Sequence, residues 1–412
     1  DRKSIILLQQ RIFVQGKSPP QTLVDDWDSP PLQQTPSPVQ GVQMGLFSKT
    51  SASMRVRTHL LPVVLLLVFL LLAREIYPYA EPLNSEVAEG YTIEKVATGF
   101  GGPTCLEWAD EEHLILCDRD EGRILSLNAS DEYAATTLLS GLSHPHGFHL
   151  TQHHAFVSEE GKLTRYNRSN FTLSDPIILI EGVPSGNHQT NAINAFPNGT
   201  LIWHSGSTCN VCVEVDERNA ALLWVNPDSG EHGLLATGVR NSFDGVWVSG
   251  MGYLFSDNGR DWDGDHPDEE INLLVVGAAY GWPEDEPEYP IPIGTLGPVA
   301  QWAPHTSLNG LDFRPMNSQL PGLNSSAGEG YTVYATVYGS WNTLLPQGHE
   351  IVRIDFTPNQ ANSTIPSEQW DSTVTRFATD LGTPLPLRFG PDGNLYYATF
   401  GSGGSLYRIT AN

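Results

Sequence analysis

The chain has 412 residues, enough for one large all-β domain together with non-globular segments. Its 47 acidic residues outnumber its 22 basic residues, and the formal net charge is −25. This charge excludes nucleic acid and anionic membrane surfaces as favoured partners, whereas a neutral ligand such as a sugar is compatible with it.

The first 80 residues show no pattern of a folded domain. Residues 1–53 include a Pro- and Gln-rich stretch without a sustained apolar period, so we expect a disordered or artefactual segment. The apolar run Leu60–Ala73 would cover only about 21 Å as a helix, short of the ~30 Å hydrocarbon core of a membrane. We therefore interpret residues 54–80 as a signal peptide, or as a signal anchor that attaches the N-terminus to a membrane. The remainder of the chain is expected outside the cytosol, secreted or anchored.

Sequons and cysteines agree with export. Six N-x-S/T sequons follow the apolar run and none precedes it: Asn128, Asn167, Asn170, Asn198, Asn324 and Asn362. Cys105 and Cys117 flank an expected hairpin turn, where facing strands would allow a disulfide. Cys209 and Cys212 permit a tight disulfide, half of a metal site or a redox pair. Because no second CxxC is present and the expected compartment is oxidising, the sequence favours the structural disulfide.

Residues 90–412 are expected to form one all-β domain. Short apolar strands joined by turns rich in Gly, Asn, Asp and Pro recur six times, starting near residues 111, 153, 198, 251, 330 and 393. Six repeats of about 40 to 60 residues built from strand pairs indicate a six-bladed β-propeller. A β-sandwich is the competing fold, but it does not account for six similar units.

The stretch 257–283 (DNGRDWDGDHPDEEINLLVVGAAYGWP) is the most acidic part of the domain. Seven carboxylates fall between Asp257 and Glu270. Such a loop needs either water or a cation, and its short side chains and exposed carbonyls suit Ca²⁺. An EF-hand is excluded, because Asn272 stands where the bidentate Glu of that motif belongs. A solvated surface loop remains the alternative.

Three further stretches carry candidate chemistry. His188, in GNHQT, is available as a general base, although a loop histidine is more often merely exposed. Arg240 and Asn241, in GVRN, could bind an anionic cofactor or steady developing negative charge, or Arg240 could pair with a neighbouring carboxylate. Trp341, in YGSWN, could stack on a flat ligand or pack between blades.

The order of these motifs resembles that of the soluble quinoprotein glucose/sorbosone dehydrogenase family, which includes fungal pyranose dehydrogenases. GNHQT, GSTCNVC, GVRNS, DNGRDWDGD with PDEEINLL and YGWP, YGSWN and FGPDGNLYYA follow one another, and the resemblance covers about residues 92–410. It implies a six-bladed propeller that binds pyrroloquinoline quinone and Ca²⁺, oxidises a sugar and passes electrons to an external acceptor.

The resemblance also implies roles for individual residues. His188 matches the catalytic base, and Arg240 matches the cation beside the quinone oxygens, with Asn241 next to it. The calcium ligands are expected from the backbone around three consecutive residues, namely Gly259, Arg260 and Asp261. Further cofactor contacts are expected from Trp341 and Arg388.

The chain departs from the family pattern where cations usually hold the cofactor carboxylates. Asn342 is followed by Thr343, and Arg388 is the only arginine in the segment before Pro391. Each charge-assisted contact contributes about 1.5–3 kcal/mol, so we expect weaker cofactor binding. Two alternatives stay open: a non-catalytic binding propeller stabilised by calcium, and a calcium-dependent lactonase-like hydrolase.

Overall fold

The computed structural model describes residues 61–69, 84–261, 266–284, 291–340, 347–359 and 363–412. The chain divides into two units, Asp1–Leu60 and Leu61–Asn412, and every described residue belongs to the second. Residues 61–69 form a helix, and no helix within the described ranges is long and apolar enough to span a membrane. The predicted segment 1–53 and most of the predicted export segment 54–80 lie outside the described residues.

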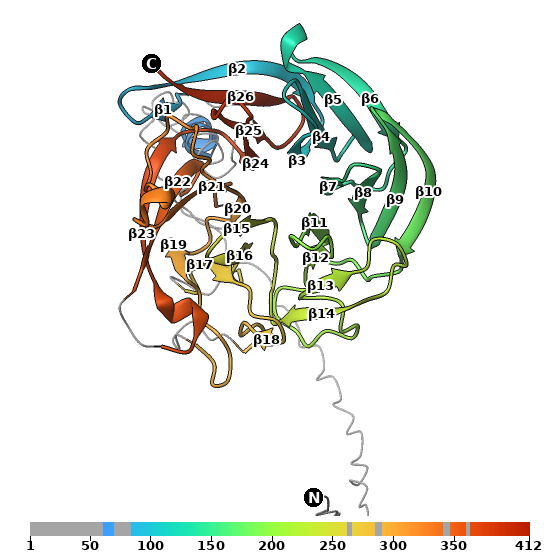
Figure 1. Cartoon of the computed structure of the whole chain (residues 1–412). Helices are drawn as coiled ribbons and strands as arrows, with labels where there is room; N and C mark the ends of the chain where they lie inside the picture. Colours follow the sequence, from blue (N-terminus) through green and yellow to red (C-terminus); the bar gives the residue numbers. More distant parts are fainter. Residues whose placement is uncertain (1–60, 70–83, 262–265, 285–290, 341–346, 360–362) are drawn as a thin grey trace, which may run out of the picture. The chain divides into compact units, whose positions relative to one another are not determined.

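Six sheets, numbered here as blades 1 to 6 in chain order, follow one another around a common axis (Figure 1). Blade 1 contains β3 (Pro103–Trp108), β4 (His113–Asp118), β5 (Arg123–Asn128) and β6 (Ala134–Ser140). Blade 2 contains β7 (Gly147–Leu150), β8 (His154–Glu159), β9 (Lys162–Ser169) and β10 (Thr172–Ile180). Blade 3 contains β11 (Thr190–Ala195), β12 (Leu201–Ser205), β13 (Ala221–Val225), β14 (His232–Thr237) and the short parallel edge strand β18 (Ala278–Ala279).

The second half of the ring repeats this arrangement. Blade 4 contains β15 (Gly245–Val248), β16 (Gly252–Asp257), β17 (Glu269–Leu273) and β19 (Ala300–Trp302). Blade 5 contains β20 (Leu308–Phe313), β21 (Tyr331–Val337), β22 (Glu350–Pro358), β23 (Trp370–Thr379) and the added edge strand β1 (Glu86–Val87). Blade 6 contains β24 (Pro384–Phe389), β25 (Leu395–Thr399), β26 (Gly404–Ala411) and β2 (Tyr91–Phe100). Three short 3₁₀ turns, η1 (Ala129–Asp131), η2 (Ser325–Ala327) and η3 (Pro366–Gln369), lie in the connections.

The ring closes through strands from both ends of the domain. β2, near the start of the domain, is the outer strand of blade 6, where it pairs antiparallel with β26 from Tyr91↔Ala411 to Phe100↔Gly404. Opening the ring would therefore break a β-ladder that joins the two ends of the domain. A propeller keeps only the short outer edges of its blades, and this ladder holds the first and last strands of the ring together.

The prediction of a six-bladed propeller is confirmed. Each predicted repeat begins just before the second strand of a blade, for example residue 111 before β4 and residue 393 before β25. Second and third strands are covered by neighbouring blades on both faces, so most of them contain an apolar run; in β4 every residue after His113 is buried. Outer strands such as β6 are largely exposed and give a weaker pattern.

The apolar core lies between neighbouring blades. Leu254 and Ile271 of blade 4 pack in one cluster with Leu311, Val333 and Val352 of blade 5. Stacking in this way buries both faces of each sheet, which one blade cannot achieve alone.

The loops that form the candidate site converge because strand direction alternates within each blade. The chain entering each first strand and the turn joining the second and third strands lie at the same end of the ring. Residues 119–122, 181–189, 206–220, 238–244, 258–261 and 266–268 belong to such connections. Segments far apart in the sequence thus meet around the axis (Figure 1).

Candidate functional site

A cavity of about 920 Å³ lies among these loops. Every blade, or a connection beside it, contributes to its wall: Arg119, His144, His146, Glu160, His188, Asn191, Asn210, Arg240, Asn241, Phe243, Asn258, Gly259, Asp261, Glu269, Ser307, Tyr338, Leu385 and Phe400. The volume falls within the range of small-molecule and cofactor sites. His188, Arg240, Asn241, Gly259 and Asp261 are brought together here, as the sequence predicted.

His188 lies half-buried in the loop between β10 and β11. Its Nδ1 is 2.8 Å from Ser207 Oγ, and that hydroxyl donates its single proton to the carbonyl oxygen of Cys209 at 2.8 Å. Ser207 Oγ therefore accepts a hydrogen bond from Nδ1–H, and Nε2 of the neutral ring keeps its lone pair. Burial, together with the nearby charge of Arg240, lowers the pKa of His188 to about 3. The ring is therefore neutral near pH 7 and offers Nε2 as a proton acceptor.

Arg240 is fixed in the cavity wall by the loops around it. The residue is only 3% exposed. Its Nε donates to the carbonyl oxygen of Asn210 at 3.2 Å, and Nη1 donates to that of Asn258 at 3.1 Å. Nη2 donates to Asn210 Oδ1 at 2.8 Å and to Asp261 Oδ2 at 3.0 Å. Four of the five guanidinium N–H groups are thus used within the protein, which holds the cation in one orientation.

One carboxylate of the acidic stretch fixes the turn at Arg240 and Asn241. Asp257 Oδ2 accepts the backbone N–H of Arg240 at 3.0 Å, and Oδ1 accepts that of Asn241 at 2.7 Å. The side-chain oxygen of Asn241 also accepts from Asn191 Nδ2 at 3.1 Å. Asp257 therefore organises the cavity wall through backbone contacts.

The start of the acidic loop presents oxygen atoms that suit a divalent cation. Glu269 is 2% exposed; its Oε2 accepts from Gly259 N at 3.2 Å and its Oε1 from Ser307 N at 3.0 Å. Burial raises the pKa of Glu269 to about 7, although these hydrogen bonds act in the opposite direction. Asn258 Oδ1 is buried and, within the described part of the chain, has no hydrogen-bond partner. A cation would compensate both the buried carboxylate and the unsatisfied amide oxygen.

The three predicted calcium ligands have different surroundings. Gly259 lines the cavity next to Glu269. Asp261 also lines it, but its carboxylate forms the ion pair with Arg240. Arg260 is buried and its Nη2 donates to the carbonyl oxygen of Pro283 at 3.1 Å. Asn258 and Glu269 line the same cavity beside this predicted set, and residues 262–265 lie outside the described residues.

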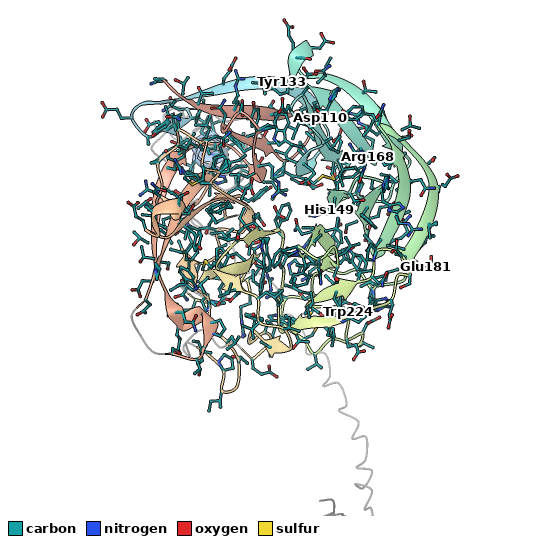
Figure 2. All side chains as sticks on the ribbon, in the orientation of Figure 1. Asp110, Tyr133, His149, Arg168, Glu181 and Trp224 are labelled. Atoms are coloured by element: carbon teal, nitrogen blue, oxygen red, sulfur yellow. A yellow bond between two sulfur atoms is a disulfide. The ribbon has the colours of Figure 1, made fainter. Side chains whose placement is uncertain are left out.

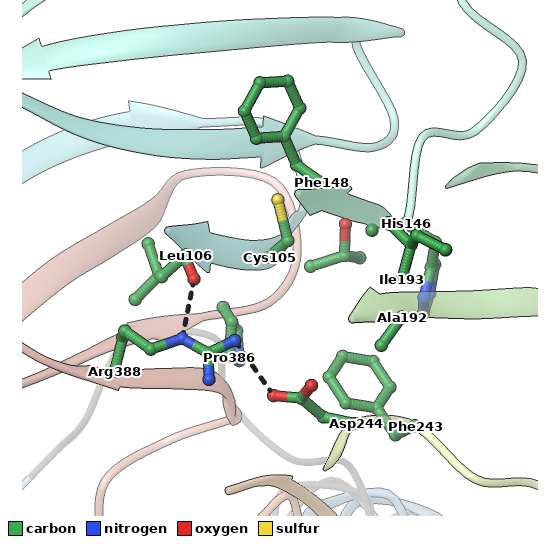
Figure 3. Close-up of a pocket in the computed structure, with 12 residues that line it drawn as sticks. Cys105, Leu106, His146, Phe148, Ala192, Ile193, Phe243, Asp244, Pro386 and Arg388 are labelled. Carbon is green, nitrogen blue, oxygen red and sulfur yellow. Dashed lines mark hydrogen bonds and ion pairs between the residues drawn. The ribbon is translucent and has the colours of Figure 1, made fainter. Parts of the chain in front are cut away.

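Arg388 does not line the large cavity, in contrast to the predicted role in cofactor binding. It lies on the first strand of blade 6, next to the smaller space drawn in Figure 3. Its Nη2 lies 3.4 Å from Asp244 Oδ2, and its Nη1 lies 3.6 Å from Asp312 Oδ1. Its Nε lies 3.9 Å from Glu107 Oε2 and donates to the carbonyl oxygen of Leu106 at 3.0 Å. Arg388 therefore pairs with carboxylates and lies outside the set of residues that line the large cavity.

These groups form a largely buried charge cluster on the inner strands of the ring and in the connection before β15, defined here as the axial cluster: Arg388, Glu107, Asp244, Asp312 and His149. Figure 2 places His149 toward the centre of the ring, in contrast to Glu181 at the outer edge. Burial raises the pKa of Glu107 to about 7, and burial lowers the pKa of His149 to about 4. The cluster is therefore a structural ion-pair network, and Arg388 is the cation that holds its carboxylates.

Further aromatic and basic residues line the cavity: Tyr338 belongs to the predicted aromatic turn YGSWN, whereas Arg119 and Phe400 were not singled out by the sequence. Tyr338 and Phe400 lie with ring centroids 6.3 Å apart, and the Arg119 guanidinium lies 5.9 Å from the Phe400 centroid. Arg119 belongs to an ordinary acidic turn (DRDEG), so its sequence carries no signal of a site. The predicted stacking residue Trp341 lies outside the described residues.

Both cysteine pairs form disulfides in the structure, Cys105 with Cys117 and Cys209 with Cys212. Cys105 and Cys117 face each other across β3 and β4. The sulfur atoms of Cys209 and Cys212 lie near the Glu214 carboxylate, but the disulfide removes the thiolates that a metal would need. Of the sequon asparagines, Asn167, Asn170, Asn198 and Asn324 are exposed and Asn128 is half-buried; Asn362 lies outside the described residues. Their glycosylation stays a prediction.

No protein-family model matches the chain, and no curated protein matches it in sequence. Solved structures do share its fold. The holo form of the pyranose dehydrogenase PQQ domain from Coprinopsis cinerea aligns with a TM-score of 0.67 at 16% identity, covering 80% of this chain and 98% of that one. An iodide structure of a family AA12 carbohydrate-active enzyme from Trichoderma reesei gives 0.66 at 17% identity, covering 82% and 99%. A PQQ-bound aldose sugar dehydrogenase from Streptomyces coelicolor gives 0.60 at 18% identity, covering 81% and 100%. The chain therefore has the fold of the quinoprotein sugar dehydrogenases.

Proposed function

We propose that this protein is an oxidoreductase that oxidises a sugar with bound pyrroloquinoline quinone and Ca²⁺ and passes the electrons to an external acceptor. The observation that carries the proposal is the convergence of a neutral His188, a fixed Arg240 and the buried oxygens of Asn258 and Glu269 on one cavity. The shared fold with quinoprotein sugar dehydrogenases supports it.

The residues of the cavity fit both groups. Its volume of about 920 Å³ accommodates a tricyclic ring beside a monosaccharide. Arg119 and Arg240 offer positive charge to an anionic ring, and Tyr338 and Phe400 offer apolar faces. Asn258 and Glu269 supply hard oxygen atoms for calcium. When bound, the quinone supplies the electron acceptor and the calcium ion supplies a Lewis acid.

The chemistry assigned to the chain itself is proton transfer and positioning. Nε2 of His188 accepts the proton of the sugar hydroxyl, since Nδ1–H is committed to Ser207. Arg240 stabilises negative charge in the cavity without reorientation, because its hydrogen bonds already fix the guanidinium. The sugar is neutral, so the net acidity of the chain does not oppose its binding.

We further propose that the domain works outside the cytosol, as a secreted protein or held by an N-terminal anchor. The short apolar run and the distribution of sequons support export. The exposure of Asn167, Asn170 and Asn198 leaves these side chains accessible for glycosylation. Mass spectrometry of the protein secreted from a eukaryotic host tests this proposal: glycans on these sequons are expected, and an unmodified cytosolic protein would contradict it.

The activity is tested by adding quinone and calcium to the purified protein and following reduction by a panel of aldoses and ketoses. We expect calcium-dependent reduction by at least one sugar, and a loss of about 10²–10⁴-fold in kcat for His188→Gln. A matched control is His154→Gln, since His154 lies on β8 outside the cavity wall. Absence of reduction by every sugar at millimolar quinone would overturn the proposal.

A second candidate function is a non-catalytic binding propeller that keeps calcium for rigidity. It is favoured by two observations: most guanidinium N–H groups of Arg240 are used internally, and Leu385 rather than Arg388 reaches the cavity wall. It predicts calcium-dependent thermal stability without quinone binding. Hydrolysis of lactones in the absence of quinone would instead support the lactonase-like alternative.

A further inference from the structure

We propose that the loop closed by the Cys209–Cys212 disulfide is the positioning element of this site, with Ser207 and Asn210 as the residues through which it holds His188 and Arg240. The effect on activity rests on the proposed function, whereas the effect on His188 itself does not.

The first connection runs from the loop to His188. Ser207 is fully buried, and its hydroxyl bridges Nδ1 of His188 and the carbonyl oxygen of Cys209, with both distances 2.8 Å. The backbone N–H of His188 also donates to the carbonyl oxygen of Ser207 at 3.1 Å. Removing the Ser207 hydroxyl would release the constraint that keeps the proton on Nδ1. Ser207 therefore sets which ring nitrogen of His188 remains an acceptor.

Close packing strengthens this connection. A Cβ atom added at Gly206 would lie 2.6 Å from Cβ of His188 and 2.9 Å from the carbonyl oxygen of Gln189. Only glycine allows the strand end at Ser205 to approach the His188 loop this closely. The separation between the two segments is therefore fixed by the backbone as well as by the side-chain hydrogen bonds.

The second connection runs from the loop to Arg240. The backbone oxygen of Asn210 accepts from Nε of Arg240 at 3.2 Å and from Nε1 of Trp282 at 3.0 Å. Its Oδ1 accepts from Nη2 of Arg240 at 2.8 Å and from the backbone N–H of Asp261 at 2.8 Å, and its Nδ2 donates to the carbonyl oxygen of Asp261 at 3.2 Å. One asparagine thus joins the guanidinium, the acidic loop and the Trp282 corner.

The disulfide is needed because the loop has little apolar burial of its own. Val211, Val213 and Val215 are 45%, 83% and 103% exposed. Cys209 and Cys212 bracket Asn210, so the covalent bond restricts the residue that makes the contacts above. Without it, the loop would be held chiefly by polar contacts and by the hydrogen bonds from Thr208 to the Glu214 carboxylate.

The tautomer of His188 provides a test that needs neither quinone nor sugar. In protein labelled with ¹⁵N-histidine, the His188 signals are assigned by their loss in His188→Gln. We expect the Nδ1–H tautomer in the wild type and a mixture of tautomers in Ser207→Ala. Ser242→Ala is the matched control, because Ser242 Oγ contacts Nδ1 of His204 at the same 2.8 Å in a buried pair that does not line the cavity. A wild-type Nε2–H tautomer, or an unchanged tautomer in Ser207→Ala, would overturn the proposal for Ser207.

The disulfide and Asn210 are tested by Cys209→Ala/Cys212→Ala and Asn210→Ala. We expect both to reduce the calcium-dependent rise in Tm, since Asn210 holds Asp261 in place, and the double variant also to mix the His188 tautomers. Where turnover is measurable, kcat should fall about tenfold to a hundredfold with KM changed less than threefold. Cys105→Ala/Cys117→Ala is the control, which should retain the His188 tautomer. An unchanged tautomer and calcium response in the Cys209 and Cys212 variant would overturn the role of the loop, whereas a normal response without any turnover would count only against the proposed activity.

Discussion

Replacing Arg388 by Met should destabilise the propeller strongly at neutral pH, because it removes the cation from the axial cluster. The Arg388 side chain is 18% exposed and lies 3.4–3.9 Å from carboxylates of Asp244, Asp312 and Glu107. Burial raises the pKa of each carboxyl group, and the Arg388 charge opposes that rise. Removing one partner of a buried ion pair typically costs about 3–5 kcal/mol. We therefore expect Arg388→Met to lower the free energy of unfolding by about 3–5 kcal/mol at pH 8.

The pH dependence follows from the direction of the same shifts. A carboxyl group whose pKa is raised on folding contributes stability below its unfolded pKa, near 4, and loses that contribution as pH rises through its folded pKa. In the wild type, Glu107 loses this stabilising contribution as pH rises through its folded pKa of about 7. Without Arg388 the folded pKa values rise further, so the variant should lose less stability at pH 5 than at pH 8.

Urea unfolding followed by tryptophan fluorescence measures the free energy of unfolding at pH 8 and at pH 5. Arg408→Met is the control, because Arg408 pairs with Glu94 at a site where the two side chains are 30% and 56% exposed, and such a pair contributes about 0–1 kcal/mol. Equal losses for the two arginine variants, or a loss for Arg388→Met that does not depend on pH, would refute the assignment of Arg388 to a structural ion-pair network.

Three further predictions concern the site and its surroundings. Burial lowers the pKa of His204 from about 6.5 to about 3. Below pH 6.5 the unfolded chain therefore binds a proton that the folded protein does not bind, so the wild type loses stability as pH falls. In urea titrations, His204→Gln should reduce the stability lost between pH 7.5 and pH 5 by about 2 kcal/mol. Gly206→Ala should displace His188, so turnover should fall strongly while Tm changes little. A lower Tm in calorimetry together with normal turnover would contradict this prediction. Free calcium at 100 times its Kd should add about 2.7 kcal/mol to the free energy of unfolding, and Asn258→Leu should abolish the gain; an equal response to calcium in both proteins would exclude Asn258 from the cation site.

The sequence predicted the ring of six sheets well, because most second and third strands are covered on both faces and contain an apolar run. The resemblance also implied that His188, Arg240 and Gly259 share one site, and all three line the same cavity. It was harder to predict which side chains of a blade's first strand reach the cavity. The register of β24 and β25 is irregular between Pro384 and Leu387. On this strand Leu385 reaches the cavity, whereas Arg388 joins the axial cluster.

The contacts that fix the site could not be inferred from local pattern. Ser207 and Asn210 lie in the motif GSTCNVC, but the sequence assigned them no role, and they acquire one only when the turn of blade 3 meets the loops before β11 and β15. Similarly, the engagement of Arg240 by Asp261 depends on two loops separated by the whole of β15 and β16. Such contacts arise where loops of one blade or of neighbouring blades meet, which no single segment encodes.

Calorimetric titration of the purified protein with pyrroloquinoline quinone, with and without calcium, tests the central claim most directly. We predict saturable binding that calcium strengthens and that His188→Gln retains, because His188 acts on the sugar rather than holding the cofactor. No binding heat at millimolar quinone in the presence of calcium would contradict the account.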